Sequence, residues 1–340
     1  MARWKTMAAV AAAAAALLTG CSQAATTPAT TGGPGSHGDA DVATGGKLFA
    51  TADIETANLK ADVGPGVFPR NLTQAMGTTR IEQKPTRVVV LDSGELDAVL
   101  ALGVTPVGMA TNSGQTGVPS YLADRVADIP TVGPINTLDL EKIAALKPDL
   151  ILGSKLRAAD LYPQLSAIAP TVFSIRPGFP WKENFQLVGA ALGEENQATK
   201  LLNDYQTKAN QVKAGLSGAP QISLLRFMNG KIRLYGNKSF IGVILTDIGL
   251  PRPANQNIDE LAVEISKERI DEANADWIFY SSLGSGPAPD EHAVVSGALW
   301  PNLGAVKSGH AVRVDDEVWF LGLGPIGAMR VLDDLQKTLG

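Results

Sequence analysis

Side chains that commonly carry out chemistry are scarce in this chain of 340 residues. No two of its three histidines, His37, His292 and His310, have the spacing that would place a pair on one element as metal ligands. The only cysteine is Cys21, so the folded part has no disulfide framework, thiolate metal site or cysteine nucleophile. No serine stands in a G-x-S-x-G motif. The sequence therefore predicts a protein that is not an enzyme, with no intrinsic cofactor and no directly bound metal.

One glycine-rich motif could hold a phosphate group. Residues 322–327, Gly-Leu-Gly-Pro-Ile-Gly, match G-x-G-x-x-G between a strand pattern and a helix pattern. A dinucleotide site needs a further strand that carries a carboxylate for the ribose, and the chain ends at Gly340 before one could follow. We therefore expect this motif to be a tight turn that leads into the last helix.

The first residues have the pattern of an export signal. Arg3 and Lys5 precede an alanine-rich apolar run at 7–18, which is shorter than the roughly 20 residues that span a membrane. Residues 18–21, Leu-Thr-Gly-Cys, resemble the lipobox of bacterial lipoproteins. This resemblance implies a signal peptide at 1–20, lipid on Cys21 and anchoring at the extracytoplasmic face of the cell membrane. The alternative is an ordinary export signal followed by a chance cysteine.

The composition indicates a tether followed by a globular part. Residues 21–46 are rich in Thr, Gly, Ala and Pro and hold almost no large apolar side chain, so we expect a flexible tether. The remainder is long enough for two lobes of ordinary size. The net charge is −5, and no basic stripe of the kind that binds nucleic acid is present.

Alternating strand and helix patterns fill residues 87–178, after a leading segment at 47–86 with a small hairpin at 71–84. Apolar runs at 87–91, 104–110, 149–153 and 171–175 predict strands. Helix patterns occupy 94–102, 138–146 and 158–168. Helices between short apolar strands are typical of a parallel sheet that is covered on both faces, so we expect a first lobe here.

A similar order returns in residues 217–340. Strands are predicted at 221–227, 231–235, 276–280 and 311–314, and helices at 239–248, 268–273 and 326–339. Residues 141–154 and 268–281 also share an acid, a base and an isoleucine, followed by an aspartate, an apolar strand and a serine at matching offsets. The repeat predicts a second lobe built like the first.

Residues 179–216 separate the two halves and predict two helices. Apolar positions recur at helical spacing over 181–192 and again from 198 to 216, and Gly193 lies between them. The first helix, about 18 Å long, would carry the chain between the lobes. We therefore predict an α/β fold of two similar Rossmann-like lobes joined by a single long linking helix. A ligand would lie in the cleft, beyond the carboxyl ends of the strands.

Several stretches together resemble the ferric-siderophore/vitamin B12 class of substrate-binding proteins of ABC importers. They are residues 77–91, 102–108, 140–151 and 318–320, and the resemblance runs in order from 71 to 340. It implies a periplasmic-binding domain at about 87–340 with one rigid linking helix and a small closure on binding. It also implies a monomer that captures a ferric siderophore and delivers it to an ABC permease dimer for iron uptake.

The resemblance also implies where the cargo binds, because this family holds its ligand on the loops at the carboxyl ends of the strands. Arginine suits the anionic oxygens around the iron, and aromatic faces suit the apolar parts of a chelate. Carried onto this chain, the expected ligand-binding residues are Ser93, Asn112, Arg157, Trp181, Arg226, Tyr235, Trp319 and Phe320. The alternatives are that Arg157 is a solvated charge, that Arg226 belongs to a structural ion pair and that Trp319 packs the core.

Two glutamates occupy the same place in the two repeats. The family docks on its permease through one carboxylate on each lobe, which implies this role for Glu141 and Glu268. The alternative is that the two match only because the repeats match. Two other functions stay open: capture of haem or cobalamin, with Tyr235 as a candidate axial ligand of haem, and a non-transport envelope protein or enzyme on the same scaffold.

Overall fold

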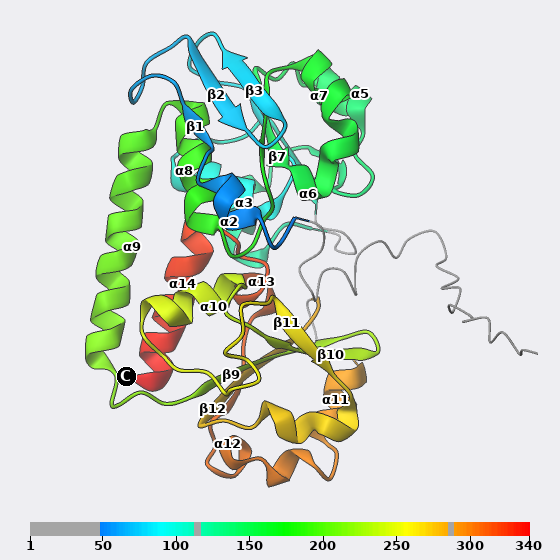
Figure 1. Cartoon of the computed structure of the whole chain (residues 1–340). Helices are drawn as coiled ribbons and strands as arrows, with labels where there is room; N and C mark the ends of the chain where they lie inside the picture. Colours follow the sequence, from blue (N-terminus) through cyan, green and yellow to red (C-terminus); the bar gives the residue numbers. More distant parts are fainter. Residues whose placement is uncertain (1–47, 112–116, 285–288) are drawn as a thin grey trace, which may run out of the picture. The chain divides into compact units, whose positions relative to one another are not determined.

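The first lobe is built on a parallel sheet (Figure 1). In the computed structural model, which describes residues 48–111, 117–284 and 289–340, this sheet has the strand order β6-β5-β4-β7-β8. Every neighbouring pair is parallel, as the apolar runs predicted. The strands are β4 (Val88–Val90), β5 (Gly108–Thr111), β6 (Thr131–Pro134), β7 (Leu150–Ser154) and β8 (Thr171–Ser174).

Hydrophobic cores cover both faces of this sheet. Successive residues of β4 point to opposite faces, so Val88 and Val90 join one core and Val89 joins the other. The first core is closed by α3 (Ser93–Ala101) and α8 (Trp181–Leu192), and the second by α5 (Leu140–Ala145) and α7 (Tyr162–Ile168). The helix predicted at 158–168 is divided into α6 (Lys155–Ala158), η2 (Ala159–Leu161) and α7. Pro163, the second residue of α7, lacks the N–H that would continue an earlier helix, so a new helix starts here.

The second lobe repeats the strand order with one change of direction. Its sheet has the order β11-β10-β9-β12-β13, in which β9, β12 and β13 are parallel and β10 is antiparallel to both neighbours. Only Asn229 and Gly230, with φ of +72° at the glycine, separate β9 from β10, and so short a turn forces a hairpin. The strands are β9 (Ile222–Met228), β10 (Lys231–Tyr235), β11 (Ala262–Ile265), β12 (Trp277–Ser282) and β13 (Ala311–Arg313).

The sequence repeat has a structural counterpart. β7 lies between β4 and β8, and β12 lies between β9 and β13. The aspartate before each strand fastens its neighbour: Asp149 accepts a hydrogen bond from the backbone N–H of Arg87 (2.8 Å), and Asp276 accepts one from that of Gln221 (2.7 Å). The matching aspartates therefore bind the starts of the central strands. The second repeat begins with a 3₁₀ helix, η3 (Lys267–Ala273), in place of α5.

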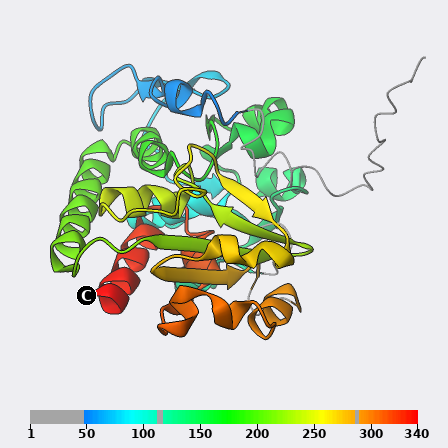
Figure 2. The same cartoon turned by 60° about the horizontal axis from the view of Figure 1, so that its bottom comes forward.

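The helix that passes between the lobes is α9 (Glu195–Gly215), and not α8, which was expected to do so. α8 buries most of its apolar side chains in the first lobe, and the chain reverses at Gly193, which has φ of +70°. Along α9, Ala198 lies in the core of the first lobe, whereas Tyr205 and Val212 lie in that of the second. Its 21 residues correspond to about 31 Å. The last helix, α14 (Pro325–Leu339), lies beside α9 in both views (Figures 1 and 2).

The leading segment forms the predicted hairpin and a short helix. β2 (Arg70–Gln74) and β3 (Gly77–Ile81) pair antiparallel, and β1 (Lys60–Ala61) adds to the edge of β2. Buried Arg70 joins this sheet to the crossing, because its guanidinium contacts Glu195 at 2.5 Å. The remaining elements are α2 (Ala52–Thr56), η1 (Ser120–Leu122), α4 (Ala123–Val126), α10 (Phe240–Asp247), α11 (Pro289–Val295), η4 (Trp300–Asn302), α12 (Gly304–Lys307) and α13 (Asp316–Trp319). In the described part of the chain, no helix combines the length and apolar character needed to cross a membrane.

Candidate binding site at the carboxyl ends of the strands

Two arginines stand at the carboxyl edge of the first sheet. Arg157 follows β7 and is exposed, and its Nε lies 3.5 Å from Oδ2 of Asp92, the residue that precedes α3. Arg176 follows β8 and is buried, with its guanidinium 4.6 Å from the ring centre of Phe49. Burial, together with the charge of Arg157, lowers the pKa of Arg176 to about 10. The two positive charges therefore repel each other, and an anion bound at this edge would relieve that repulsion.

Arg226, in the middle of β9, is held in an internal ion pair. Its Nε and Nη2 donate to the two carboxylate oxygens of Asp316 at 2.7 and 2.6 Å, and both side chains are buried. Ser281 donates to the same carboxylate at 2.7 Å, and the hydroxyl of Tyr235 lies 3.4 Å from Arg226 Nη1. Burial by itself would lower the pKa of Arg226, but Tyr235 and Asp316 raise it above its usual value. A bidentate pair of this kind uses the guanidinium fork that a ligand would need.

A pocket of about 430 Å³ lies beside this pair, and Ser120 of the first lobe contributes to its lining. The other lining residues come from the second lobe: Gly284, Arg313, Val314, Asp315, Asp316 and Glu317. Arg313 is the last residue of β13 and is exposed, and its Nε donates to Glu291 at 2.8 Å. Glu291 is held in turn by the hydroxyl of Ser282. This pocket brings an oriented guanidinium to the carboxyl end of the second sheet.

The sequence profile of the periplasmic binding protein family matches residues 88–318, which is more than half of the chain. The chain belongs to this family. It is 36% identical over 281 residues to the probable siderophore-binding lipoprotein YfiY of Bacillus subtilis, with 78% of this chain and 86% of the relative covered. It is 31% identical to the achromobactin-binding periplasmic protein of Dickeya dadantii, with 75% and 87% covered.

A solved structure agrees with this assignment. The crystal structure of Staphylococcus aureus SirA complexed with staphyloferrin B superposes with a TM-score of 0.72 and 33% identity, and the match covers 79% of this chain and 98% of that one. The family resemblance predicted from residues 71–340 is therefore confirmed, and so is the two-lobed α/β fold. The matched relatives are named as binding proteins.

The structure places the predicted aromatic residues of this periplasmic binding protein in its core. Trp319 is fully buried, stacks on Phe279 with ring centres 4.8 Å apart and donates from Nε1 to Asp334 at 2.9 Å. Trp181 is 1% exposed and packs edge-on against Tyr205. Neither tryptophan offers a face to a ligand, so the expectation for both is corrected. Both belong to the hydrophobic core of the second lobe, where apolar side chains surround them.

The other predicted residues are placed as follows. Tyr235 and Phe320 are buried and pack edge to face with ring centres 4.8 Å apart. Ser93 is buried, and its hydroxyl donates to the carbonyl oxygen of Leu321 at 3.2 Å, so it contacts the chain returning from the second lobe. Arg157 is exposed at the edge of the sheet and Arg226 is paired internally. Asn112 and Cys21 lie outside the described residues.

Sequence reasoning missed Arg176 and Arg313. Both stand where a predicted strand ends, at 171–175 and 311–314, so the rule that ligands lie at the carboxyl ends would have found them. Glu141 and Glu268 are exposed, in the first turns of α5 and η3. A hydrogen bond from Ser266 lowers the pKa of Glu268. Among the described residues, no three His, Cys, Asp or Glu side chains form a group that could hold a metal ion.

Proposed function

We propose that this periplasmic binding protein captures a ferric siderophore outside the cytoplasmic membrane and delivers it to an ABC permease. The observation that carries the proposal is the set of arginines at the carboxyl edges of the two sheets. Arg157 and Arg176 lie on the first lobe, and Arg313 lines the pocket of about 430 Å³ on the second. A ferric chelate presents anionic oxygens, and a guanidinium binds such oxygens with a fork of charged donors. The relatives named for siderophores support the same cargo.

The ligand we propose is held by charge and hydrogen bonds more than by stacking. The four aromatic side chains predicted for the site, at positions 181, 235, 319 and 320, are all buried. An oxygen-rich, anionic chelate therefore suits the site better than a flat apolar one. Haem would need an accessible axial ligand, and the hydroxyl of Tyr235 lies beside Arg226 in a buried network. No geometry in the described part of the chain favours haem or cobalamin over a ferric siderophore.

We further propose that the protein works as a lipid-anchored monomer. The lipobox at 18–21 supports a lipid on Cys21, and the tether at 21–46 would let the binding domain reach the permease dimer. Exposed Glu141 and Glu268, at matching places on the two lobes, would meet basic groups of that dimer. Binding requires no chemical step, so we propose no enzymatic activity.

Titration of intrinsic fluorescence tests the cargo. We expect ferric siderophores to bind with micromolar or tighter Kd and to quench the fluorescence, whereas iron-free siderophore, haem and cobalamin bind much more weakly. Tight binding of haem or cobalamin, or of none of these compounds, would contradict the proposal. Isothermal titration calorimetry of the same compounds would exclude quenching that comes from light absorption by the ligand.

Substitution of Arg157 tests whether the arginines bind the chelate. Replacing it by glutamine removes an exposed charge at the edge of the sheet, so we expect affinity for the ferric chelate to fall roughly tenfold, because a hydrogen bond to a charged group contributes about 1.5–3 kcal/mol. Arg80→Gln is the control, since Arg80 is also exposed but lies on the β2–β3 hairpin beside Glu82. Equal loss in both variants would show that net charge alone, and not a site at Arg157, attracts the chelate.

A further inference from the structure

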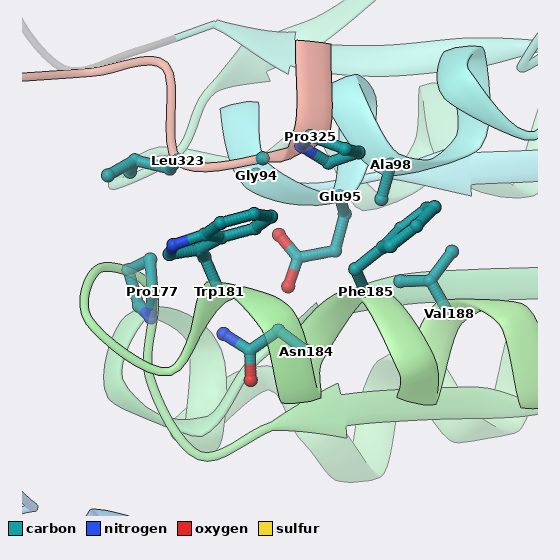
Figure 3. A pocket seen from close by; sticks show the side chains of 11 residues that line it. Gly94, Glu95, Ala98, Pro177, Trp181, Asn184, Phe185, Val188, Leu323 and Pro325 are labelled. Carbon is teal, nitrogen blue, oxygen red and sulfur yellow. The ribbon is translucent and has the colours of Figure 1, made fainter. Parts of the chain in front are cut away.

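Residues 320–327, which we call the return segment, run from α13 into α14 and press closely against the first lobe. Figure 3 shows Leu323 and Pro325 of this segment beside Gly94 of α3, with Trp181 of α8 opposite them. The cavity that these residues line has a volume of only about 10 Å³. A Cβ atom at Gly94 would lie 3.2 Å from the carbonyl oxygen of Leu323. The fit leaves little room for the return segment to shift against α3.

Asp97 on α3 binds the beginning of α14. Its Oδ1 accepts a hydrogen bond from the backbone N–H of Ile326 (2.8 Å), and its Oδ2 accepts one from that of Gly327 (2.9 Å). α3 packs in the core of the first lobe, whereas α14 places Val331 and Leu335 in that of the second. One fully buried carboxylate therefore joins the two lobes. Amide groups at a helix N-terminus bind acceptor oxygens readily, and here the acceptor is a carboxyl side chain of the same protein.

The glycine-rich motif at 322–327 makes this contact possible. A Cβ atom at Gly324 would lie 2.6 Å from the carboxyl carbon of Asp97, and one at Gly327 would lie 2.8 Å from the Cα of Gly322. Any side chain at these positions would push the segment away from α3. The motif that resembles a phosphate loop therefore accommodates Asp97.

A second residue of the first lobe strengthens the contact. The hydroxyl of Tyr121 lies 2.8 Å from Oδ2 of Asp97 and 2.9 Å from the carbonyl oxygen of Gly322, so it bridges α3 and the return segment. The preceding residue, Ser120, donates its backbone N–H to Glu317 at 2.6 Å. Both Ser120 and Glu317 line the pocket of about 430 Å³.

We propose that Asp97 and Tyr121 are positioning residues of the ligand pocket. They hold the return segment against the first lobe. Because residues 315–317 of the pocket wall lie just before this segment in the chain, their position relative to Ser120 is fixed as well. The wall includes Asp316, which holds Arg226, so the position of the ion pair follows that of the segment. This role goes beyond the proposed cargo and does not depend on which ligand the pocket takes.

Spin labels on the two lobes test the proposal without any ligand. The labels are placed at exposed Ser166 on α7 and Lys307 on α12, in the full chain with Cys21→Ser. Pulsed dipolar spectroscopy of the otherwise unchanged protein should give one narrow distance peak. We expect Asp97→Asn to lose this peak in favour of a broad distribution, because the amide cannot accept from both N–H groups. The amide protons of Ile326 and Gly327 should lose their protection from hydrogen exchange in the same variant.

Asp139→Asn is the matched control, since Asp139 caps α5 within the first lobe by accepting from the N–H of Lys142 at 3.0 Å. It removes a similar helix cap but joins no two lobes, so its distance peak should stay narrow. If Asp97→Asn does not fold, Tyr121→Phe is tested in its place. We expect its distance peak to be broader than that of the labelled protein without this substitution. The proposal would be overturned if Asp97→Asn and Tyr121→Phe, where they fold, keep a narrow and unshifted distance peak. Equal broadening of the peak in Asp139→Asn would also overturn it.

Discussion

Glu95, on the face of α3 that meets α8, has a buried carboxyl group with only one hydrogen-bonded oxygen within the described part of the chain. One oxygen accepts from the hydroxyl of Ser174 at 3.2 Å, and the other has no hydrogen-bond partner among the described residues. Burial, and next the negative charge of Asp92, raise the pKa of Glu95 to about 8. At neutral pH the folded protein therefore holds Glu95 mostly as the uncharged acid.

The raised pKa predicts the pH dependence of stability. Because the folded state binds the proton of Glu95 more tightly than the unfolded state, the free energy of unfolding should fall as the pH rises from about 4.5 to about 8. One such group contributes at most about 1.4 kcal/mol per pH unit. Glu95→Gln should remove this contribution and be the more stable protein at pH 8, by about 1 kcal/mol or more, with little difference near pH 5.

Urea unfolding from pH 5 to 9 measures this difference between the two proteins. Glu183→Gln is the control, because Glu183 is an exposed carboxylate on the neighbouring helix α8. Its stability profile should run parallel to that of the unchanged protein. Parallel profiles for Glu95→Gln as well would show that Glu95 is already ionised at neutral pH.

The burial and pairing of single residues were harder to predict from sequence than the strands that carry them. The rule that ligands lie at the carboxyl ends of strands pointed to the edge of the first sheet, where Arg157 is exposed. It could not show that Trp319 and Trp181 point into the cores, because residue type does not reveal which neighbours enclose a side chain. Nor could it show that Arg226 is already paired, since its partner Asp316 is 90 residues away in sequence.

Among the elements, the turn between α8 and α9 requires a glycine at one position. Gly193 has φ of +70°, and a Cβ atom there would lie 2.6 Å from the ring of Phe68. We expect Gly193→Ala to lower the free energy of unfolding by about 2–3 kcal/mol, of which about 1 kcal/mol comes from the left-handed backbone and the rest from the collision. Urea unfolding monitored by circular dichroism would measure the loss.

Gly103, after α3, separates these two contributions. It has φ of +78°, but no atom lies within 4 Å of the position that its Cβ would take. Gly103→Ala should therefore lose only the part due to the backbone, about 1 kcal/mol. If both variants lost the same amount, the contact between Gly193 and Phe68 would contribute nothing to the turn.

The element pattern was predictable where periodicity is strong and uncertain where length or packing decides. The apolar strands and the helices with glycine at their ends were found, because burial on both faces and a left-handed cap leave clear patterns. β6 and β11 were missed: the four residues of β6 include Gly133 and Pro134, and the four residues of β11 include Glu264. The crossing was assigned to α8 because the sequence shows where helices begin and end, but not that α9 reaches both cores.

For the whole molecule, the repeat has a consequence beyond the fold. Each lobe begins its repeat with an exposed glutamate, Glu141 on α5 and Glu268 on η3. Both stand at the start of an element that leads into the strand next to the central one, β7 or β12, so they occupy equivalent places on the two lobes. A dimeric permease would offer two equivalent basic sites, one for each lobe. Two carboxylates on one chain would then set both the orientation and the rate of docking.

Charge reversal separates this docking role from cargo binding. Glu141→Lys and Glu268→Lys should each lower uptake of the ferric chelate by cells about tenfold or more, because a like charge at the contact opposes association. Cargo affinity should stay unchanged, since neither residue lines the pocket of about 430 Å³. Glu82→Lys, which reverses an exposed charge just after the β2–β3 hairpin, should leave both quantities unchanged. Cargo affinity that fell in parallel with uptake would mean that the two glutamates act on the binding domain itself, and the permease would then have to recognise another surface of the two lobes.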